Sequence, residues 1–208
     1  MRYVLLVLLI ASSILLGHLS SQILEVDELV LGSLADQLAK EQIEVFIEKK
    51  ERLSTFGHIF VAFFILFKVT FITLLLDLGC FLYNVKIKFE KLFDIVVKAE
   101  FVFLLAIILK TAWFYYSLSG FTLEDYQNNQ PLSLLNFIDY ETLDPWYIYP
   151  LQVLNIFEIA YWFLLAYLIG REINHTINTK GLQIVASSYG VGLLILVGTI
   201  MFLTLNMS

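Results

Sequence analysis

The chain has 208 residues, of which 59% are hydrophobic and 15% aromatic, and its mean hydropathy is +0.80. Because soluble proteins are roughly 45–50% apolar, this composition excludes an ordinary soluble domain and predicts an integral membrane protein, with the lipid bilayer as a partner. The net charge of −6 offers no basic surface to a nucleic acid, and the single cysteine, Cys80, excludes an internal disulfide and a cysteine-built metal site.

The chain begins with a short apolar run, Tyr3 to Gly17, that follows Arg2. A run of about 15 residues is short for a membrane span, which needs about 20, and is typical of a signal-peptide core. Two interpretations stay open: a signal anchor retained over residues 1–18, or a signal peptide that is cleaved. No small-x-small cleavage site follows the run, which favours the retained anchor.

Residues 19–55 are predicted to be extracytoplasmic and to form an amphipathic helix over residues 25–52. Acidic residues lie in its first turn and basic residues in its last, as the helix macrodipole favours. Ser54 or Thr55 could cap the next span and so separate two helices. The helix could bind a partner, lie on the membrane or pack on the protein's own loops. Its apolar stripe comprises Leu31, Leu34, Ala35, Leu38, Ala39, Ile43, Phe46 and Ile47.

Residues 56–208 are predicted to form a four-span membrane domain. The spans cover about residues 56–85, 99–120, 148–170 and 182–205, and an outer loop of residues 121–147 joins the middle two. With the first apolar segment, they predict an all-α polytopic membrane protein of four or five transmembrane helices plus the external amphipathic helix.

Basic residues orient these spans, because retained cations favour the cytoplasmic side of a membrane. Four lysines precede the span at 99–120, whereas the outer loop has neither lysine nor arginine. We therefore predict a cytoplasmic N-terminus and an extracytoplasmic C-terminus. The helical spacing of apolar residues from Phe89 to Val97 predicts a basic helix at the inner membrane surface, or an ordinary loop leading into the span. The four lysines are Lys86, Lys88, Lys91 and Lys98.

Charged residues also fall inside the predicted spans, where an isolated charge costs at least about 2.5–3.5 kcal/mol. Counted from the ends of their spans, Lys68, Lys110 and Glu158 lie near one depth, and Asp77 lies nearer the cytoplasm. We predict that Glu158 pairs with Lys110 or Lys68, with Asn155 on the same helix face. This network is either a structural clamp or a path for ions or protons. No internal repeat or interrupted pair of spans supports a path.

The last span contains two overlapping patterns of small residues, Ala186 to Gly190 and Ser188 to Gly192. Small residues at this spacing let helices approach closely. They predict helix packing within the protein or, alternatively, a homo-oligomer.

The sequence lacks the residue patterns that membrane enzymes use. HExxH, GxSxG, P-loop and GxGxxG motifs are absent, and the three histidines lie on different segments. The acidic residues of the outer loop do not match the spacing of an EF-hand. We therefore expect no catalytic residue, no metal site and no cofactor.

The segment from Leu151 to Gly170, LQVLNIFEIAYWFLLAYLIG, leads through a short polar loop to a span containing serine and glycine. Over residues 151–206 this pattern resembles the Yip (Ypt-interacting protein) family of small five-span membrane proteins. The chain departs from that family in its N-terminal apolar segment, its external helix and its long outer loop.

Together these observations predict a non-enzymatic membrane adaptor or assembly subunit of a membrane complex. The helix over residues 25–52 and the outer loop would contact another membrane or extracytoplasmic protein. The alternative is a small transporter or channel subunit that moves ions or protons with the charged residues of its spans.

Overall fold

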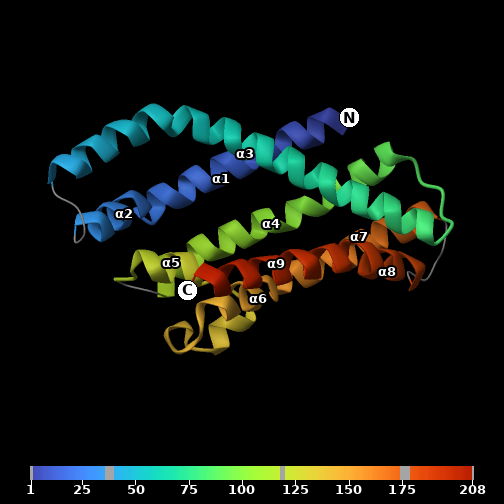
Figure 1. Cartoon of the computed structure of the whole chain (residues 1–208). Coiled ribbons are helices and arrows are strands. Elements are labelled where there is room, and N and C mark those ends of the chain that lie inside the picture. Colours follow the sequence, from blue (N-terminus) through green and yellow to red (C-terminus); the bar gives the residue numbers. More distant parts are fainter. Residues whose placement is uncertain (1, 36–39, 118–119, 174–178, 208) are drawn as a thin grey trace.

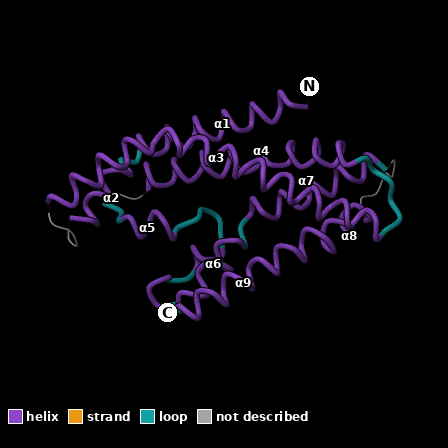
Figure 2. Tube along the Cα trace, turned by 45° about the horizontal axis from the view of Figure 1, so that its top comes forward, coloured by secondary structure: helices purple, strands orange, loops and turns teal. Residues whose placement is uncertain are grey.

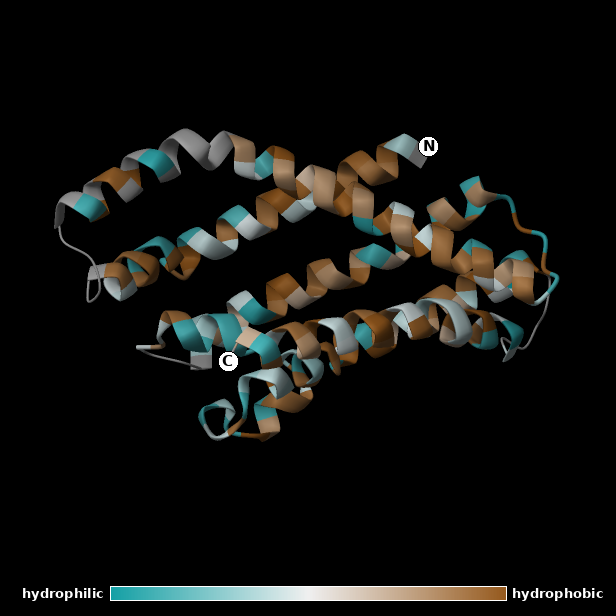
Figure 3. Cartoon of the chain, in the orientation of Figure 1, coloured by the Kyte–Doolittle hydropathy of each residue, from teal (hydrophilic) through white to brown (hydrophobic). Residues whose placement is uncertain are grey.

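The computed structural model describes residues 2–35, 40–117, 120–173 and 179–207, and these are largely helical. Within these ranges, three apolar helical segments are long enough to cross a membrane: Tyr3–Ile23, Phe56–Leu82 and Thr179–Met207. The predicted all-helical, membrane-embedded class is therefore confirmed. In Figure 3, apolar residues follow the long helices and hydrophilic residues gather at the ends of the molecule.

The long elements lie side by side between two ends of the molecule (Figures 1 and 2). One end holds the turn after α3, with the N-terminus towards it, whereas α2, α5 and the C-terminus lie at the other end. The termini thus lie towards opposite ends, and which end faces the cytoplasm stays a prediction. The long elements are α1 (Arg2–Ile23), α3 (Lys40–Leu82), α4 (Phe89–Ser117), α6 (Pro145–Val153) with α7 (Ile156–Glu172), and α8 (Thr179–Val185) with η3 (Ala186–Gly190) and α9 (Val191–Met207). The shorter elements are α2 (Val26–Ala35), α5 (Leu123–Asn128), η1 (Leu134–Phe137) and η2 (Tyr140–Thr142).

The first helix, α1, is longer than the predicted segment of residues 1–18. Polar residues after Gly17 continue the helix to Ile23, since Ser20 lies against α4 and accepts a hydrogen bond from the Thr111 hydroxyl at 2.7 Å. Leu9 is also buried, and α1 packs along α4. The resulting length suffices to cross a membrane, which needs about 20 residues.

The predicted break between the external helix and the second span is absent from the structure. Helix α3 runs without a break for 43 residues, so Ser54 and Thr55 lie inside it and the predicted helix boundary there is wrong. No proline interrupts this stretch, and the amphipathic sequence extends the apolar helix directly. The boundary instead lies between α2 and α3, and residues 36–39 of the predicted stripe, with Leu38 and Ala39, lie outside the described residues.

The predicted basic surface helix is likewise part of a longer element. Helix α4 begins at Phe89 and continues to Ser117, with no glycine or proline between the two. Leu92 and Val96 are fully buried, so the apolar face of this segment packs inside the protein.

The best-packed core surrounds the start of α4, where α3, α7 and α8 meet it. Helices α7 and α8 approach so closely that a Cβ atom on Gly181 would lie 2.2 Å from the carbonyl oxygen of Ala166. By contrast, α9 packs on α6 and has no buried residue. Fully buried side chains of the core include Val69, Leu76, Leu92, Val96, Leu165, Ile169, Ile184 and Val185.

Two of the predicted spans are interrupted. The segment over residues 148–170 divides into α6 and α7 at Leu154 and Asn155, and the last span contains the π-helical turn η3. The sequence shows no pair of spans broken by glycine or proline, and the break at Leu154 and Asn155 contains neither residue. Interruptions of this kind occur in membrane helices where other parts of the protein satisfy the freed backbone groups.

Candidate functional site

The interruption between α6 and α7 is held by the outer loop. Leu134 donates its backbone N–H to the Leu154 carbonyl at 3.0 Å, and Ile156 donates to the Leu132 carbonyl at 3.2 Å. Ser133 and Asn155 thus form an isolated antiparallel bridge. Leu132 has a φ of +59°, a conformation that a leucine rarely adopts. The loop therefore supplies the hydrogen bonds that the broken helix lacks.

Asn155 starts α7 as its N-cap. Its side-chain oxygen accepts the backbone N–H of Glu158 at 2.9 Å. An asparagine followed three residues later by a glutamate is a recognised helix-start signal, although here it lies within an apolar run. This signal could have revealed the interruption from the sequence.

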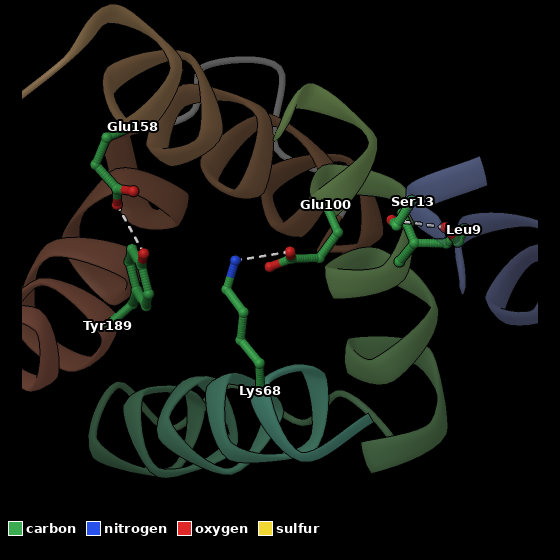
Figure 4. A network of polar contacts seen from close by, with 6 residues as sticks. All are labelled: Leu9, Ser13, Lys68, Glu100, Glu158 and Tyr189. Carbon is green, nitrogen blue, oxygen red and sulfur yellow. Dashed lines mark hydrogen bonds and ion pairs between the residues drawn. The ribbon is translucent and has the colours of Figure 1, made fainter. Parts of the chain in front are cut away.

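The Glu158 side chain does not turn back to cap the helix. Its Oε1 atom accepts hydrogen bonds from Trp162 Nε1 at 2.9 Å and from the Tyr189 hydroxyl at 2.7 Å (Figure 4). Tyr189 belongs to the π-helical turn η3. The two interrupted spans thus meet at this carboxylate. No described residue donates a hydrogen bond to its other oxygen, Oε2.

Lys68 pairs with an acid that the sequence analysis did not select. Its Nζ atom lies 2.8 Å from Oε2 of Glu100 and 4.1 Å from the centre of the Phe103 ring. The predicted pairing of Glu158 with Lys68 or Lys110 is therefore wrong. Glu100 stood at the edge of the span predicted over 99–120, but α4 starts earlier and carries it well inside the bundle.

The Lys68–Glu100 pair is unevenly buried. The Lys68 side chain is 35% exposed and that of Glu100 only 7%. Glu100 Oε1 and the Tyr161 hydroxyl are both buried; among the described residues they make no hydrogen bond of standard geometry, but the two side chains interact with each other.

A cavity of about 630 Å³ brings together three residues of the predicted charge network, and Gly192 of the predicted packing residues also lines it. Lys68, Asn155 and Glu158 line it, with side chains from α3, α4, α5, α6 and α9. Figure 4 shows Lys68 extending from α3 into the space between Glu100 and the Glu158–Tyr189 pair. Other polar groups in the lining are Gln127, Gln130, Tyr149, Gln152, Tyr189 and Thr199.

A second pocket of about 230 Å³ meets the first at Glu158. Apart from Asn155, Glu158 and Trp162, the side chains that line it are purely hydrocarbon. Ile159 and Phe163 are more than half exposed, as expected for side chains that face lipid. Glu158 therefore lies between the larger cavity, whose mainly apolar lining includes several polar side chains, and a smaller pocket that is almost wholly apolar.

The structure places Lys110 and Asp77 away from this cavity. Lys110 Nζ lies 4.4 Å from the ring centre of Tyr126 in α5 and 6.0 Å from that of Phe114. Asp77 is half-buried on α3, one turn from Cys80. The predicted network of five residues thus divides, and only Lys68, Asn155 and Glu158 share a site.

The small residues of the last span pack within the chain. Cβ atoms on Gly190 and Gly192 would lie 2.5 Å and 2.6 Å from Trp162 and Leu75, respectively. Ser188 is buried against Gly79 of α3, whereas Ala186 is exposed. Close approach of helices inside the protein therefore accounts for three of these four positions.

The four loop lysines, Lys86, Lys88, Lys91 and Lys98, are all exposed. Lys91 lies 3.5 Å from the carboxylate of Glu172 at the end of α7. Exposed pairs of this kind contribute little to stability, and the lysines remain available to a membrane surface. Among the described residues, no group of histidine, cysteine, aspartate and glutamate side chains has an arrangement that could hold a metal ion.

The outer loop is ordered by Asp125. Thr122 and Asp125 form a capping box at the start of α5, and the Tyr140 hydroxyl donates to Asp125 Oδ1 at 2.7 Å. The hydrogen bonds from the Thr122 backbone, the Tyr140 hydroxyl and the Thr122 side chain lower the pKa of Asp125 below its ordinary value of 3.8. The same contact with Asp125 raises the pKa of Tyr140.

Comparisons with protein-family models, curated proteins and solved structures found no match to this chain. The resemblance of residues 151–206 to the Yip family therefore stays a prediction from those residues.

Proposed function

We propose that this protein is a small membrane transporter or channel subunit that moves an ion, a proton or a small solute through the cavity between Lys68 and Glu158. In this proposal the chain crosses the membrane five times, with its N-terminus in the cytoplasm and its C-terminus outside. This role is favoured over an adaptor role because the span formed by α6 and α7 breaks beside a cavity lined by Lys68 and Glu158.

The interrupted span is the observation that carries the proposal. In many transporters, a membrane helix breaks near the middle of the bilayer and the free helix end faces the transported species. Here Asn155 and Glu158 lie at the first turn of α7, and both line the cavity. An irregular backbone at this depth is consistent with a role in lining a polar space.

The charges around the cavity provide a second argument. Lys68 and Glu100 form an ion pair at 2.8 Å, whereas Glu158 accepts hydrogen bonds from the neutral donors Trp162 and Tyr189 and has Lys68 only as a more distant cation. A carboxylate in a low-dielectric environment without a directly paired cation tends to bind a proton or a positively charged group. Glu158 could therefore exchange one for the other during transport.

The test is a flux assay on purified protein in liposomes, with proton movement followed by an internal pH-sensitive dye. Glu158→Gln removes the charge but keeps an oxygen that can accept from Trp162 and Tyr189. We expect it to abolish flux while the protein remains folded. Glu124→Gln removes an exposed carboxylate on α5 and serves as the matched control. Equal flux through both variants, or none through the wild type under any imposed gradient, would contradict the proposal.

The proposed orientation has its own test. A reporter that is active only outside the cytoplasm is fused after Met207, and a second fusion is made in the turn between α3 and α4. We expect activity from the first fusion only, because the loop lysines favour the cytoplasmic side. The opposite pattern would reverse the proposed orientation.

A second candidate function is the adaptor or assembly subunit predicted from the sequence. It is favoured by the first part of α3, since residues 40–55 precede the apolar segment Phe56–Leu82 and project about 24 Å along the helix axis. Val45 and Ile47 are exposed on this part of the helix. Such apolar side chains outside the bilayer are typical of a surface that contacts another protein.

The adaptor proposal is tested by gentle-detergent purification from native membranes, with mass spectrometry of proteins bound in stoichiometric amount. We expect a partner that is retained by the wild type and lost with Val45→Glu/Ile47→Glu. The exposed pair Leu194→Ala/Ile195→Ala on α9 serves as a control. A protein that purifies alone would argue against an adaptor.

A further inference from the structure

We infer that the cavity binds a small amphiphilic organic monocation, an amine or onium group attached to an apolar body, whose charge lies against Glu158. This inference rests on the proposed function, because it names the class of molecule that the same site would carry. Three features support it: the charges at the cavity, the aromatic side chains of its walls and the smaller apolar pocket beside it.

The charge of the site selects a cation. Lys68 contributes one positive charge, and Glu100 and Glu158 in their ionised forms contribute two negative charges. Lys68 is already paired with Glu100 at 2.8 Å, and Glu100 itself lies outside the cavity lining. An anion entering the cavity would meet the Glu158 carboxylate and an ammonium that is already paired. A monovalent cation would neutralise the site.

The aromatic walls favour an organic cation over a metal ion. Phe64, Phe71, Phe103, Tyr149 and Tyr189 all line the cavity. Aromatic faces attract amines and onium groups, and the attraction is larger where water is excluded. An alkali or alkaline-earth ion would instead require several oxygen ligands. Of the two carboxylates near this space, Glu158 already accepts two hydrogen bonds and Glu100 is paired with Lys68.

The smaller, apolar pocket is the reason why we expect the ligand to be amphiphilic. Glu158 lines both the larger cavity and the apolar pocket, which is walled by Phe163, Leu182 and Leu193. A molecule with its charge at Glu158 can therefore extend an apolar group into the smaller pocket. The exposed positions of Ile159 and Phe163 place the mouth of that pocket towards lipid, where amphiphilic molecules concentrate.

Binding can be measured with the protein's own tryptophan. Trp162 donates to Glu158 and lines the apolar pocket, so its fluorescence reports on a ligand at this point. The full-length chain with Trp113→Phe and Trp146→Phe retains Trp162 as its single tryptophan. In lipid nanodiscs it is titrated with tetraphenylphosphonium and with tetraphenylborate, which have nearly the same shape and opposite charge. A second single-tryptophan variant, Trp146→Phe with Trp162→Phe, retains the exposed Trp113, and its titration corrects for probe dissolved in the lipid.

We expect saturable quenching of Trp162 by tetraphenylphosphonium and none by tetraphenylborate. Glu158→Gln should weaken binding by at least about tenfold, which corresponds to roughly 1.4 kcal/mol, whereas Glu124→Gln should leave it unchanged. If Glu158→Gln does not fold, Thr199→Leu provides the second variant, because Thr199 is exposed on α9, lines the cavity and can be enlarged to narrow it without changing any charge. Equal binding of the anion, or unchanged binding in both cavity variants, would overturn the inference.

The inference and the proposed function can fail separately. Proton flux that is lost with Glu158→Gln, without cation-selective binding of tetraphenylphosphonium, would keep the transport proposal and overturn this ligand class. Selective binding without flux of protons or of radiolabelled tetraphenylphosphonium would support the ligand class and remove the transport role.

Discussion

The helices pack tightly around the start of α4, whereas near the outer loop the same bundle encloses a cavity of about 630 Å³. In the first region, Leu92, Val96, Leu165 and Ile169 are fully buried, and α7 packs against both α4 and α8. In the second region, polar side chains and a broken helix replace that core. The two regions share α3, α4 and α7, so each of these helices changes its surroundings along its length.

The comparison indicates a division of roles within one bundle. Close packing of small residues and branched side chains holds the helices in register, since interiors at native density leave little room for movement. The region around the cavity can then hold the Glu158 carboxylate between two pockets, because the tightly packed region keeps the chain folded. Substitutions in the first region should therefore act on stability, and those in the second on function.

The largest effect is expected from Gly181→Ala in the packed region. The new methyl group would lie 2.2 Å from the Ala166 carbonyl oxygen, and neither backbone can move aside easily. We expect a loss of at least about 3 kcal/mol of stability or a failure to accumulate in membranes. Thermal melting in detergent measures the change. Gly198→Ala on α9, where no atom lies within 4 Å, is the control and should leave melting unchanged or slightly raise it.

A smaller loss is expected from Lys68→Met, at the border of the two regions. The substitution leaves Glu100, only 7% exposed, without its cation, and because Lys68 is itself partly exposed we expect a loss of roughly 1–3 kcal/mol. The double variant Lys68→Met/Glu100→Gln should recover most of the loss, since it removes both charges. Lys91→Met, which breaks an exposed pair, should change stability by less than about 0.5 kcal/mol. A double variant no more stable than the single one would refute this account.

Tyr189→Phe should cost about 1–2 kcal/mol in the cavity region. It removes one of the two donors to Glu158 but retains the ring contacts with Tyr161 and Trp162. Because Glu158 then has one fewer hydrogen bond, the fractional loss of flux should be larger than the fractional loss of the free energy of unfolding. Melting and flux are measured on the same preparation. Equal losses of melting temperature and flux in Tyr189→Phe and Gly181→Ala would remove the distinction between the two regions.

The smallest effect concerns the pH dependence of the outer loop. The pKa of Asp125 is lowered in the folded chain, so its hydrogen bonds stabilise the loop above the ordinary pKa of 3.8. That contribution is lost as the pH falls below 3.8 and through the lower folded value. The ring signals of isotope-labelled Tyr140, followed by NMR down to about pH 2, should change in this range. Asp125→Asn should abolish the change, and Glu124→Gln should preserve it.

The sequence predicted the class of fold and the approximate extents of the long helices, because both depend on runs of apolar residues along the chain. It also placed Lys68, Asn155 and Glu158 among the site residues from the cost of burying polar groups in a span. It did not find Glu100, because the start of α4 was placed too late. It paired Glu158 with a lysine, although depth along a helix says nothing about which neighbour each side chain faces.

Hydropathy and helix rise are local properties, so the amino-acid sequence is enough to predict a helical membrane chain with charged residues inside its spans. Which of those residues meet depends on how the helices pack together. Backbone groups of the outer loop satisfy the break at Leu154 and Asn155, and close packing of Gly190 and Gly192 brings Tyr189 to Glu158. These contacts join segments far apart in the chain, so they depend on packing that no single segment specifies.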